Sequence, residues 1–267
     1  MNKINFLIDT VKSVVCWSFI AMLVLIFFGP VLLMVVCLYP FDPARKAIHP
    51  LISTWAKLML VVCPLMNVHV EGEESLNREG IYVLVSNHQS IADIIVALHL
   101  KQSFKFIAKK ELFLIPFFGW AMTLAGYIPL VRGNRQSGQK AVTMARDFIE
   151  QGASVLFFPE GTRSPDGEIH SFKTGAFKLA AETGMPIVPI VIDGTYNLVP
   201  KGSRLFSRNT KVRLKVLPPR QPVGTDNSSI KRLVHEVQSD MIEALNQIRS
   251  KKEIELTSAS QAFNLSS

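Results

Sequence analysis

The apolar positions of the chain follow two different patterns, one after the other. An almost unbroken apolar run extends from Val14 to Leu38, and a shorter apolar segment extends from Leu51 to Val68. Beyond it, short runs rich in β-branched residues alternate with longer segments of helical periodicity. The pattern predicts membrane-anchoring helices over residues 1–68 and a globular domain over residues 69–250. The polar, serine-rich end, residues 251–267, predicts a disordered tail.

The globular part is expected to contain alternating strands and helices. Strands are expected at residues 81–85, 104–108, 127–131, 154–158, 187–192 and 211–216. Helices are expected at residues 91–101, 116–125, 137–151, 174–184 and 228–249. Strands separated by helices are typical of an α/β fold, with a mixed sheet flanked by helices on both faces. In such folds, functional side chains lie on loops beyond the carboxyl ends of the strands.

The N-terminal apolar run is long enough to cross a membrane, which takes about 20 residues. It carries no charged residue between Lys12 and Asp42, and the Gly29–Pro30 pair near its middle can kink or break a helix. Basic residues flank the run almost equally on both sides, so they give little indication of its orientation. A single span and a two-helix anchor held in one leaflet both fit the pattern, and the balanced charge favours the anchor.

Composition narrows the class of partner. Hydrophobic residues make up 48% of the 267 residues, and the net charge is +8. A basic, apolar protein is typical of binding to an anionic membrane surface or to anionic substrates. The chain lacks an RRM, zinc-finger or helix-turn-helix signature, which argues against a nucleic-acid partner. The three cysteines, Cys16, Cys37 and Cys63, lack metal-ligand spacing, so we expect no metal site and a reducing compartment.

Candidate chemistry begins at the loop after the first strand expected in the domain. His88 follows the apolar run at residues 81–85, and Asp93 falls in the first turn of a helix that opens at Ser90. A histidine with a carboxylate partner can act as a general base, because the carboxylate fixes the tautomer and stabilises the imidazolium. The spacing of Ser90 and Asp93 also resembles a helix cap. The loop therefore holds either a catalytic pair or a capping arrangement.

A second polar cluster follows the strand expected at residues 154–158, in the segment Phe158-Pro159-Glu160-Gly161-Thr162-Arg163. Proline and glycine turn the chain abruptly, which displays Glu160, Thr162 and Arg163 on the turn. Arginine offers a planar fork of donors that matches phosphate oxygens. The cluster predicts an anion-binding loop; the alternative is a surface Glu–Arg pair that stabilises the turn.

Asn87–His88 with Asp93, followed by the segment 158–163, resembles the glycerolipid acyltransferase family. The resemblance is closest to the bacterial 1-acyl-sn-glycerol-3-phosphate acyltransferases, and it covers about residues 70–220 together with the apolar N-terminus. The segment Gly126–Arg132 resembles the one in which an arginine of this family contacts the phosphate of the acceptor. Val131 departs from the commoner form, which has an acid at that position.

The resemblance implies roles for particular side chains. His88 would be the general base, Asp93 would orient it, and Lys109 would stabilise the oxyanion. The substrate-binding positions would be Asn87, Arg132, Glu160, Gly161, Thr162, Arg163 and Lys173. Among these, Arg132 and Arg163 would hold a phosphate, and Glu160 would position the glycerol or brace Arg163. The resemblance implies no cofactor.

The implied reaction moves an acyl group from acyl-carrier protein or acyl-CoA to the sn-2 hydroxyl of lysophosphatidic acid, which gives phosphatidic acid. The implied location is the bacterial inner (cytoplasmic) membrane, with the catalytic domain facing the cytoplasm and in contact with membrane lipids. Three alternatives stay open. The acceptor could be another lysophospholipid, a lyso-aminolipid or glycerol 3-phosphate, as the Val131 departure allows. The other two are a membrane-bound hydrolase, which would not use Arg132 and Arg163, and a non-enzymatic lipid-binding module, which would not need a His–Asp pair.

Overall fold

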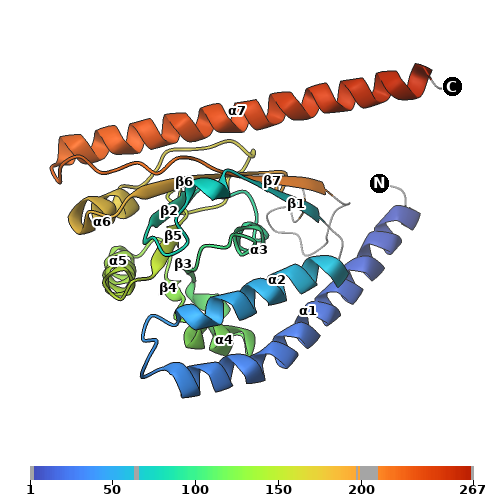
Figure 1. Cartoon of the computed structure of the whole chain (residues 1–267). Coiled ribbons are helices and arrows are strands. Elements are labelled where there is room, and N and C mark those ends of the chain that lie inside the picture. The colour runs from blue at the N-terminus through green and yellow to red at the C-terminus, as the bar shows by residue number, and fades with distance from the viewer. Residues whose placement is uncertain (1–2, 63–65, 197, 199–209, 266–267) are drawn as a thin grey trace.

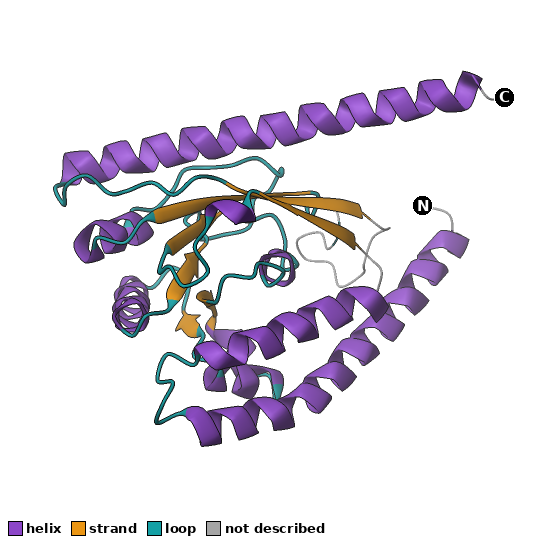
Figure 2. Ribbon diagram, viewed as in Figure 1, coloured by secondary structure: helices purple, strands orange, loops and turns teal. Residues whose placement is uncertain are grey.

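Within residues 3–62, 66–196, 198 and 210–265, which the computed structural model describes, a seven-stranded mixed sheet runs through the centre (Figure 2). Its strands are β1 (Met66–Glu71), β2 (Val83–Ser86), β3 (Phe104–Lys109), β4 (Ile128–Leu130), β5 (Ser154–Phe157), β6 (Ile187–Asp193) and β7 (Thr210–Val216). Their order across the sheet is β1-β7-β6-β2-β5-β3-β4. The strands from β6 to β4 run parallel, β7 is antiparallel to β6, and β1 is parallel to β7.

Helices cover both faces of this sheet (Figure 1). The α-helices are α1 (Lys3–Leu38), α2 (His49–Val62), α3 (Asp93–Ala97), α4 (Phe118–Leu124), α5 (Arg135–Glu150), α6 (Gly175–Thr183) and α7 (Asn227–Leu265). Short 3-10 helices are η1 (Lys46–Ile48), η2 (Glu73–Ser75) and η3 (Lys110–Leu114). The helices α5, α6 and α7 cover one face, and α2, α3 and α4, with α1 outside them, cover the other. The predicted α/β fold with flanking helices is confirmed.

The side chains of the central strand β2 show why helices must cover both faces of the sheet. Leu84 points into a core shared with α2, α3 and α4, whereas Val83 and Val85 point into a second core shared with α5, α6 and α7. Successive residues of a strand face opposite sides, so a strand that is apolar throughout must be buried on both faces. All three side chains are fully buried. The loop that follows β2 therefore leaves from the middle of a packed, rigid sheet.

The first helix is unusually long and apolar. Its segment Ile8–Leu38 is long and apolar enough to cross a membrane, and it alone among the described helices meets that test of length and composition. The helix continues through Pro30 without a break. It packs against α2, which runs back alongside it, and against α4 (Figure 1). The N-terminal part is thus a helical hairpin that lies against one face of the domain.

A buried lysine joins this hairpin to the sheet. Nζ of Lys105, in β3, donates hydrogen bonds to the main-chain carbonyls of Arg45 and Ala125, each at 2.9 Å. Arg45 lies in the connection between α1 and α2, and its Nη1 donates to the carbonyl of Thr123 in α4 at 2.7 Å. Burial lowers the pKa of Lys105 to about 7, because the interior disfavours the charged ammonium. The hairpin, α4 and β3 are therefore held together by directional bonds as well as by apolar packing.

The boundary between anchor and domain differs from the prediction. The apolar segment Leu51–Val68 divides into the end of α2 and the start of β1, so a boundary at residue 68 falls inside a strand. From residue 66 the side chains alternate between apolar and polar, which suits pairing with β7, and this alternation outweighs the apolar composition. Residues 63–65, with Cys63, lie outside the described residues.

Two helices also differ in length from the prediction. The helix expected at residues 91–101 is limited to α3, because the N–H groups of His99 and Leu100 bond three residues back in turns and do not continue the α-helix. The prediction of a disordered tail is wrong for the backbone of residues 251–265, which continue α7. The sequence has no glycine or proline between residues 227 and 265, so no backbone-breaking residue ends that helix earlier.

Candidate active site

Five loops that carry polar side chains meet at one edge of the sheet. His88 follows β2, Arg163 follows β5, Lys109 ends β3, Arg132 follows β4 and Thr195 follows β6. These strands are neighbours and parallel, so their carboxyl ends lie at the same edge. Functional sites of α/β folds form at this edge, where loops diverge from a rigid sheet. The edge therefore gathers residues that are far apart in the sequence.

At the centre of the edge, His88 and Asp93 form a buried pair. Nδ1 of His88 lies 2.8 Å from Oδ2 of Asp93, and the side chain of Asp93 is completely buried. The carboxylate also accepts the main-chain N–H groups of Gln89 at 2.7 Å and Ser90 at 2.9 Å. On its other oxygen it accepts the hydroxyl of Thr195 at 2.5 Å. A carboxylate that accepts this many hydrogen bonds stays fixed in position and satisfied when charged.

These contacts set which nitrogen of His88 is available. Because Asp93 is an acceptor, Nδ1 carries the proton that it shares with the carboxylate, and Nε2 is then the basic nitrogen. Among the described residues, Nε2 has no hydrogen-bond partner. The ring of Phe158 stacks on the imidazole with a centroid distance of 4.3 Å and an interplanar angle of 28°. The geometry therefore holds the imidazole between an acid and a ring, with one nitrogen open.

Arg132 and Arg163 bring positive charge to the same edge. Partial burial and the neighbouring charge of Arg163 lower the pKa of Arg132, while Glu111 opposes this shift. The two guanidinium groups therefore lie close enough for their charges to repel, and neither forms an ion pair with another described residue. Two adjacent unpaired cations favour a dianion such as a phosphate monoester. The arrangement can bind such an anion next to the histidine loop.

Lys173 adds to this positive region through the turn after β5. Gly161 has φ +74°, a left-handed conformation that glycine adopts without strain. A Cβ atom at Gly161 would lie 2.6 Å from Nζ of Lys173, so the lysine lies directly over the turn. The side chain of Thr162 is exposed beside them. Glycine is thus favoured here by the backbone angle, and the amine of Lys173 would have to move if a side chain were added.

Comparison with known proteins agrees with this geometry. An acyltransferase family model matches residues 67–193. The crystal structure of the 1-acyl-sn-glycerophosphate (LPA) acyltransferase PlsC from Thermotoga maritima superposes with a TM-score of 0.76 and 31% identity, and it covers 90% of this chain and 97% of that one. This chain belongs to the 1-acyl-sn-glycerol-3-phosphate acyltransferase family.

Curated members of the family share more sequence over a shorter region. The chloroplastic 1-acyl-sn-glycerol-3-phosphate acyltransferase LPAT1 of Arabidopsis thaliana is 42% identical over 67% of this chain, and the match spans 50% of its own length. The Saccharomyces cerevisiae 1-acyl-sn-glycerol-3-phosphate acyltransferase is 33% identical over 68% of this chain and 61% of its own length. The chain therefore spans about half to two thirds of such relatives. The plant relative is chloroplastic, so its name does not support a bacterial inner membrane.

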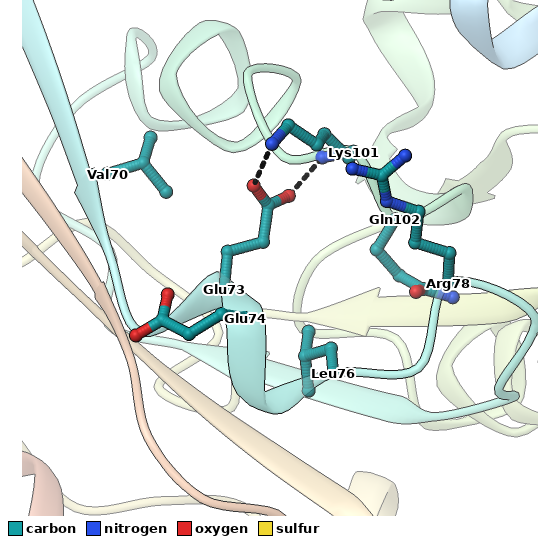
Figure 3. Close-up of a pocket in the computed structure, with 7 residues that line it drawn as sticks. All are labelled: Val70, Glu73, Glu74, Leu76, Arg78, Lys101 and Gln102. Carbon is teal, nitrogen blue, oxygen red and sulfur yellow. Dashed lines mark hydrogen bonds and ion pairs between the residues drawn. The ribbon is translucent and has the colours of Figure 1, made fainter.

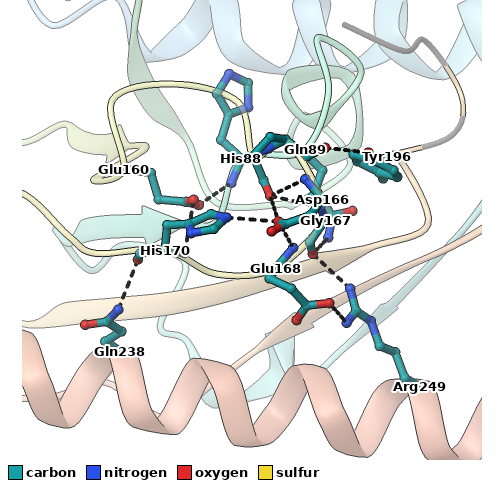
Figure 4. A network of polar contacts seen from close by, with 12 residues as sticks. His88, Gln89, Glu160, Asp166, Gly167, Glu168, His170, Tyr196, Gln238 and Arg249 are labelled. Atoms are coloured by element: carbon teal, nitrogen blue, oxygen red, sulfur yellow. Dashed lines mark hydrogen bonds and ion pairs between the residues drawn. The ribbon is translucent and has the colours of Figure 1, made fainter.

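Two residues predicted to bind substrate form hydrogen bonds with the main chain. The amide of Asn87 donates to the carbonyl of Ile192 at 2.9 Å and accepts its N–H at 2.8 Å. Glu160 accepts the main-chain N–H groups of His88 at 3.0 Å and His170 at 3.3 Å, and Figure 4 shows it between these two loops. Burial raises the pKa of Glu160, which these two N–H donors oppose. Both side chains are buried and position loops, because buried polar groups must find partners.

Lys109 makes no polar contact with the His88–Asp93 pair among the described residues, although the sequence predicts a role for it in the site. Its Nζ forms an ion pair with Glu111 at 3.2 Å, and half of its side chain is exposed. Within the described residues, no hydrogen bond or ion pair joins Lys109 to His88 or Asp93. A role for Lys109 at an oxyanion therefore stays a prediction.

Sequence reasoning missed a second layer of residues behind the histidine loop (Figure 4). The amide of Gln89 donates to the carbonyl of Gly167 at 2.9 Å, and Nη2 of Arg249 donates to the same carbonyl at 2.8 Å. Arg249 comes from α7 and also bonds to Asp193 at the end of β6. Thr195 belongs to this layer too. Its position directly after a buried parallel strand, at the same edge as His88, is the signal that could have identified it.

Two surface cavities lie away from His88. One, of about 410 Å³, is lined by Glu73, Glu74, Arg78, Lys101 and neighbours before β2 and β3 (Figure 3). The other, of about 470 Å³, lies between the end of β7 and α7. Both cavities are outside the loops that hold the His–Asp pair.

The described residues contain no group of three or more His, Cys, Asp or Glu side chains suited to a metal ion.

Proposed function

We propose that this acyltransferase moves an acyl group from a thioester to the free hydroxyl of 1-acyl-glycerol 3-phosphate, forming phosphatidic acid and a thiol. The observation that carries the proposal is the buried pair of His88 and Asp93, with Nε2 open at the edge of the sheet that also carries Arg132 and Arg163. Family membership supports acyl transfer, and the names of the relatives support lysophosphatidic acid as the acceptor.

The chemistry follows from the open nitrogen. Nε2 of His88 accepts the proton of the acceptor's hydroxyl as its oxygen attacks the thioester carbonyl carbon. A tetrahedral oxyanion forms, and the carbon–sulfur bond then breaks. The leaving thiolate accepts from Nε2 the proton that came from the acceptor's hydroxyl. Asp93 stabilises the imidazolium between these two transfers, which is the usual contribution of a carboxylate partner. Atoms and charge balance without a covalent acyl-enzyme.

The anion site orients the acceptor. Arg132 and Arg163 hold the phosphate monoester, and Lys173 adds positive potential over the Gly161 turn. When guanidinium forks hold the phosphate, they restrict the motion of the attached glycerol backbone. The hydroxyl of the acceptor then faces His88 in one preferred orientation. Lys109 at the end of β3 either stabilises the oxyanion with its ammonium group or neutralises the phosphate of the acceptor. Arg132 and Arg163 can reorient toward the substrate because they have no ion pair with another described residue to break.

The helical hairpin supplies membrane attachment. Its first helix is apolar enough to enter a bilayer, and its side-by-side packing against α2 and α4 supports an in-plane anchor in one leaflet. Acceptor and product are both lipids, so an anchored enzyme meets its substrate at high effective concentration. The net charge of +8 adds attraction to an anionic leaflet. We assign the domain to the membrane face on which the thioester donor, acyl-carrier protein or acyl-CoA, is dissolved.

Val131 supports one second candidate, which is a different acceptor. A valine beside Arg132 leaves that arginine without the acidic neighbour common in the family, so the anion site is less strictly defined. Another lysophospholipid, a lyso-aminolipid or glycerol 3-phosphate would use the same base and the same thioester.

The test is thiol release from an acyl thioester by the purified full chain in detergent, with and without each acceptor. We expect release to require lysophosphatidic acid, with phosphatidic acid as the product identified by mass spectrometry. Thiol release at the same rate with and without an acceptor would indicate a hydrolase. No thiol release with any acceptor would indicate a lipid-binding module. Faster release with another acceptor would replace lysophosphatidic acid in the proposal.

A further inference from the structure

A group of large apolar side chains is exposed on the domain itself, outside the N-terminal hairpin. Leu114, Ile115, Phe117 and Trp120 are 71%, 45%, 38% and 50% exposed, and they lie at the end of η3, in the short connection to α4 or in the first turn of α4. We call them the η3–α4 face. Scattered apolar residues on a surface are normal, but a contiguous group of this size marks an interaction site.

The η3–α4 face continues the surface of α1. Phe28 of α1 contacts the ring of Phe117 edge-on at 5.3 Å and lies 6.1 Å from the ring of Trp120. The outward side of α1 next to this contact is also apolar and exposed, as at Leu25 and Leu32. The two surfaces therefore meet without a polar boundary at the aromatic contact.

The backbone holds the face in this position. Phe117 has φ +61°, a conformation that is strained for a residue with a side chain and persists only where surroundings enforce it. Two hydrogen bonds from Lys105 and one from Arg45 fasten α4 to the hairpin connection and to β3. The face and α1 therefore form one rigid body, and a bilayer that receives α1 also meets Trp120.

We propose that the η3–α4 face inserts into the boundary between headgroups and acyl chains of the leaflet that holds α1. Tryptophan and phenylalanine favour this boundary, and Lys109 and Lys110, which precede the face, suit anionic headgroups. The occupant is lipid because the face is continuous with a helix that is itself fit for a bilayer. The inference rests on the proposed function in that the acceptor is a lipid.

This docking also fixes the orientation of the catalytic edge. The 3-10 helix η3 starts directly after Lys109, at the carboxyl end of β3, which is part of the edge that carries His88. Insertion of η3 and α4 thus brings that edge down to the headgroups, where a lysophospholipid presents its glycerol. If the protein docked through α1 alone, the distance between this edge and the lipid headgroups could vary.

Fluorescence depth measurement tests the insertion directly. The chain has three tryptophans, so Trp17→Phe with Trp55→Phe leaves Trp120 as the only reporter. The protein is bound to vesicles of phosphatidylethanolamine and phosphatidylglycerol, with or without bromine on the acyl chains. We expect brominated lipid to quench Trp120 several-fold more than a control reporter, Ile242→Trp in the chain with all three natural tryptophans replaced by phenylalanine. Residue 242 is 39% exposed on α7, which covers the opposite face of the sheet.

Equal quenching of the two reporters would overturn the proposal. So would vesicle-bound protein whose Trp120 is not quenched, because attachment would then occur through α1 alone. Unquenched Trp120 together with a concentration-dependent dimer would assign the face to a second copy of the chain. None of these quenching measurements requires catalytic turnover. A failure of the proposed reaction can therefore be distinguished from a failure of membrane insertion.

Activity gives the second measurement. Leu114→Ser with Ile115→Ser removes apolar surface that contacts little of the protein, so the fold is expected to stay intact. We expect the rate with acceptor in vesicles to fall several-fold and the rate in detergent micelles to equal that of the natural chain. The matched control is Val223→Ser, which alters a valine that is 73% exposed between β7 and α7 and is expected to change neither rate. An unchanged rate in vesicles for the double variant would contradict the proposal.

Discussion

The candidate active site has two parts that are built in opposite ways. The His88–Asp93 pair is buried, and the carboxylate accepts hydrogen bonds from the imidazole, two main-chain N–H groups and a hydroxyl. The cations of Arg132 and Arg163, which follow β4 and β5 at the same edge, have no ion-pair partner among the described residues. One part is fully satisfied by the protein, and the other is left for a ligand.

This difference follows from what each part must do. A general base works best when its orientation is set before substrate arrives, because no reorganisation is then needed in the transition state. A cation that binds a phosphate gains most when it has no internal partner to lose. Variants of the buried pair should therefore change kcat, and variants of the exposed cations should change KM. The first three predictions below test this division directly.

The largest effect is expected for His88→Ala. Removing the base should lower kcat by about 10²–10⁴-fold while KM changes little, because the anion site is intact. The side chain makes one hydrogen bond, so the fold should persist in circular dichroism. The control is His170→Ala, whose exposed imidazole pairs with Asp166 on the outside of the loop and should keep near-normal activity. A rate for His88→Ala near that of the natural chain would rule out histidine as the base.

Thr195→Val is expected to have the next largest effect. It removes the hydroxyl that donates to Oδ1 of Asp93 and leaves that oxygen buried without this partner. We expect kcat to fall about 10-fold and the free energy of unfolding to fall by about 1–3 kcal/mol, as for a lost buried hydrogen bond. Thr195→Ser keeps the hydroxyl and should restore kcat. If valine and serine behaved alike, the contact would have no part in positioning Asp93.

Substitution of the cations tests the other half of the comparison. Arg132→Gln and Arg163→Gln should each raise KM for lysophosphatidic acid about 10-fold, since each removes a charge-assisted hydrogen bond to the phosphate. Thermal unfolding should not change, because neither side chain is ion-paired within the described residues. Arg135→Gln is the matched control, a nearby exposed arginine at the start of α5. A fall in kcat with constant KM would mean that the arginines act on the transition state and not on binding.

The parts of this site that were predicted are local in the sequence. His88 and Asp93 are five residues apart, and both belong to a pattern in which an apolar strand ends and a helix begins. The strands of the domain were predicted for a similar reason, because each is a short apolar run bounded by turn residues. The strand β1 was missed because its apolar residues directly follow those of the hairpin.

The missed parts depend on which strands become neighbours. Thr195 reaches Asp93 across 102 residues of sequence, and Asn87 reaches Ile192 across 105. Those contacts exist because β6 pairs with β2, and hydrophobic periodicity does not specify strand order. Family resemblance named Asn87 and Glu160 as substrate contacts, whereas their buried positions made them partners of the main chain. The distinction between binding a ligand and positioning a loop needed three-dimensional burial.

The smallest predicted effect tests how far this positioning layer extends. Arg249→Met removes the α7 contact to the carbonyl of Gly167, which also accepts from Gln89 beside His88. It also removes the bonds of Arg249 to Glu168 and Asp193. The arginine is partly exposed and acts through two intervening contacts, so a cost of at most about 1 kcal/mol, or about a 5-fold loss in kcat, is expected. Arg249→Lys should recover part of it. The control is Arg220→Met, which breaks the pair with Asp240 of the same helix and should leave kcat unchanged. If both methionine variants lowered kcat equally, α7 would support the fold as a whole, and the rigid region behind His88 would end at the loop that carries Gly167.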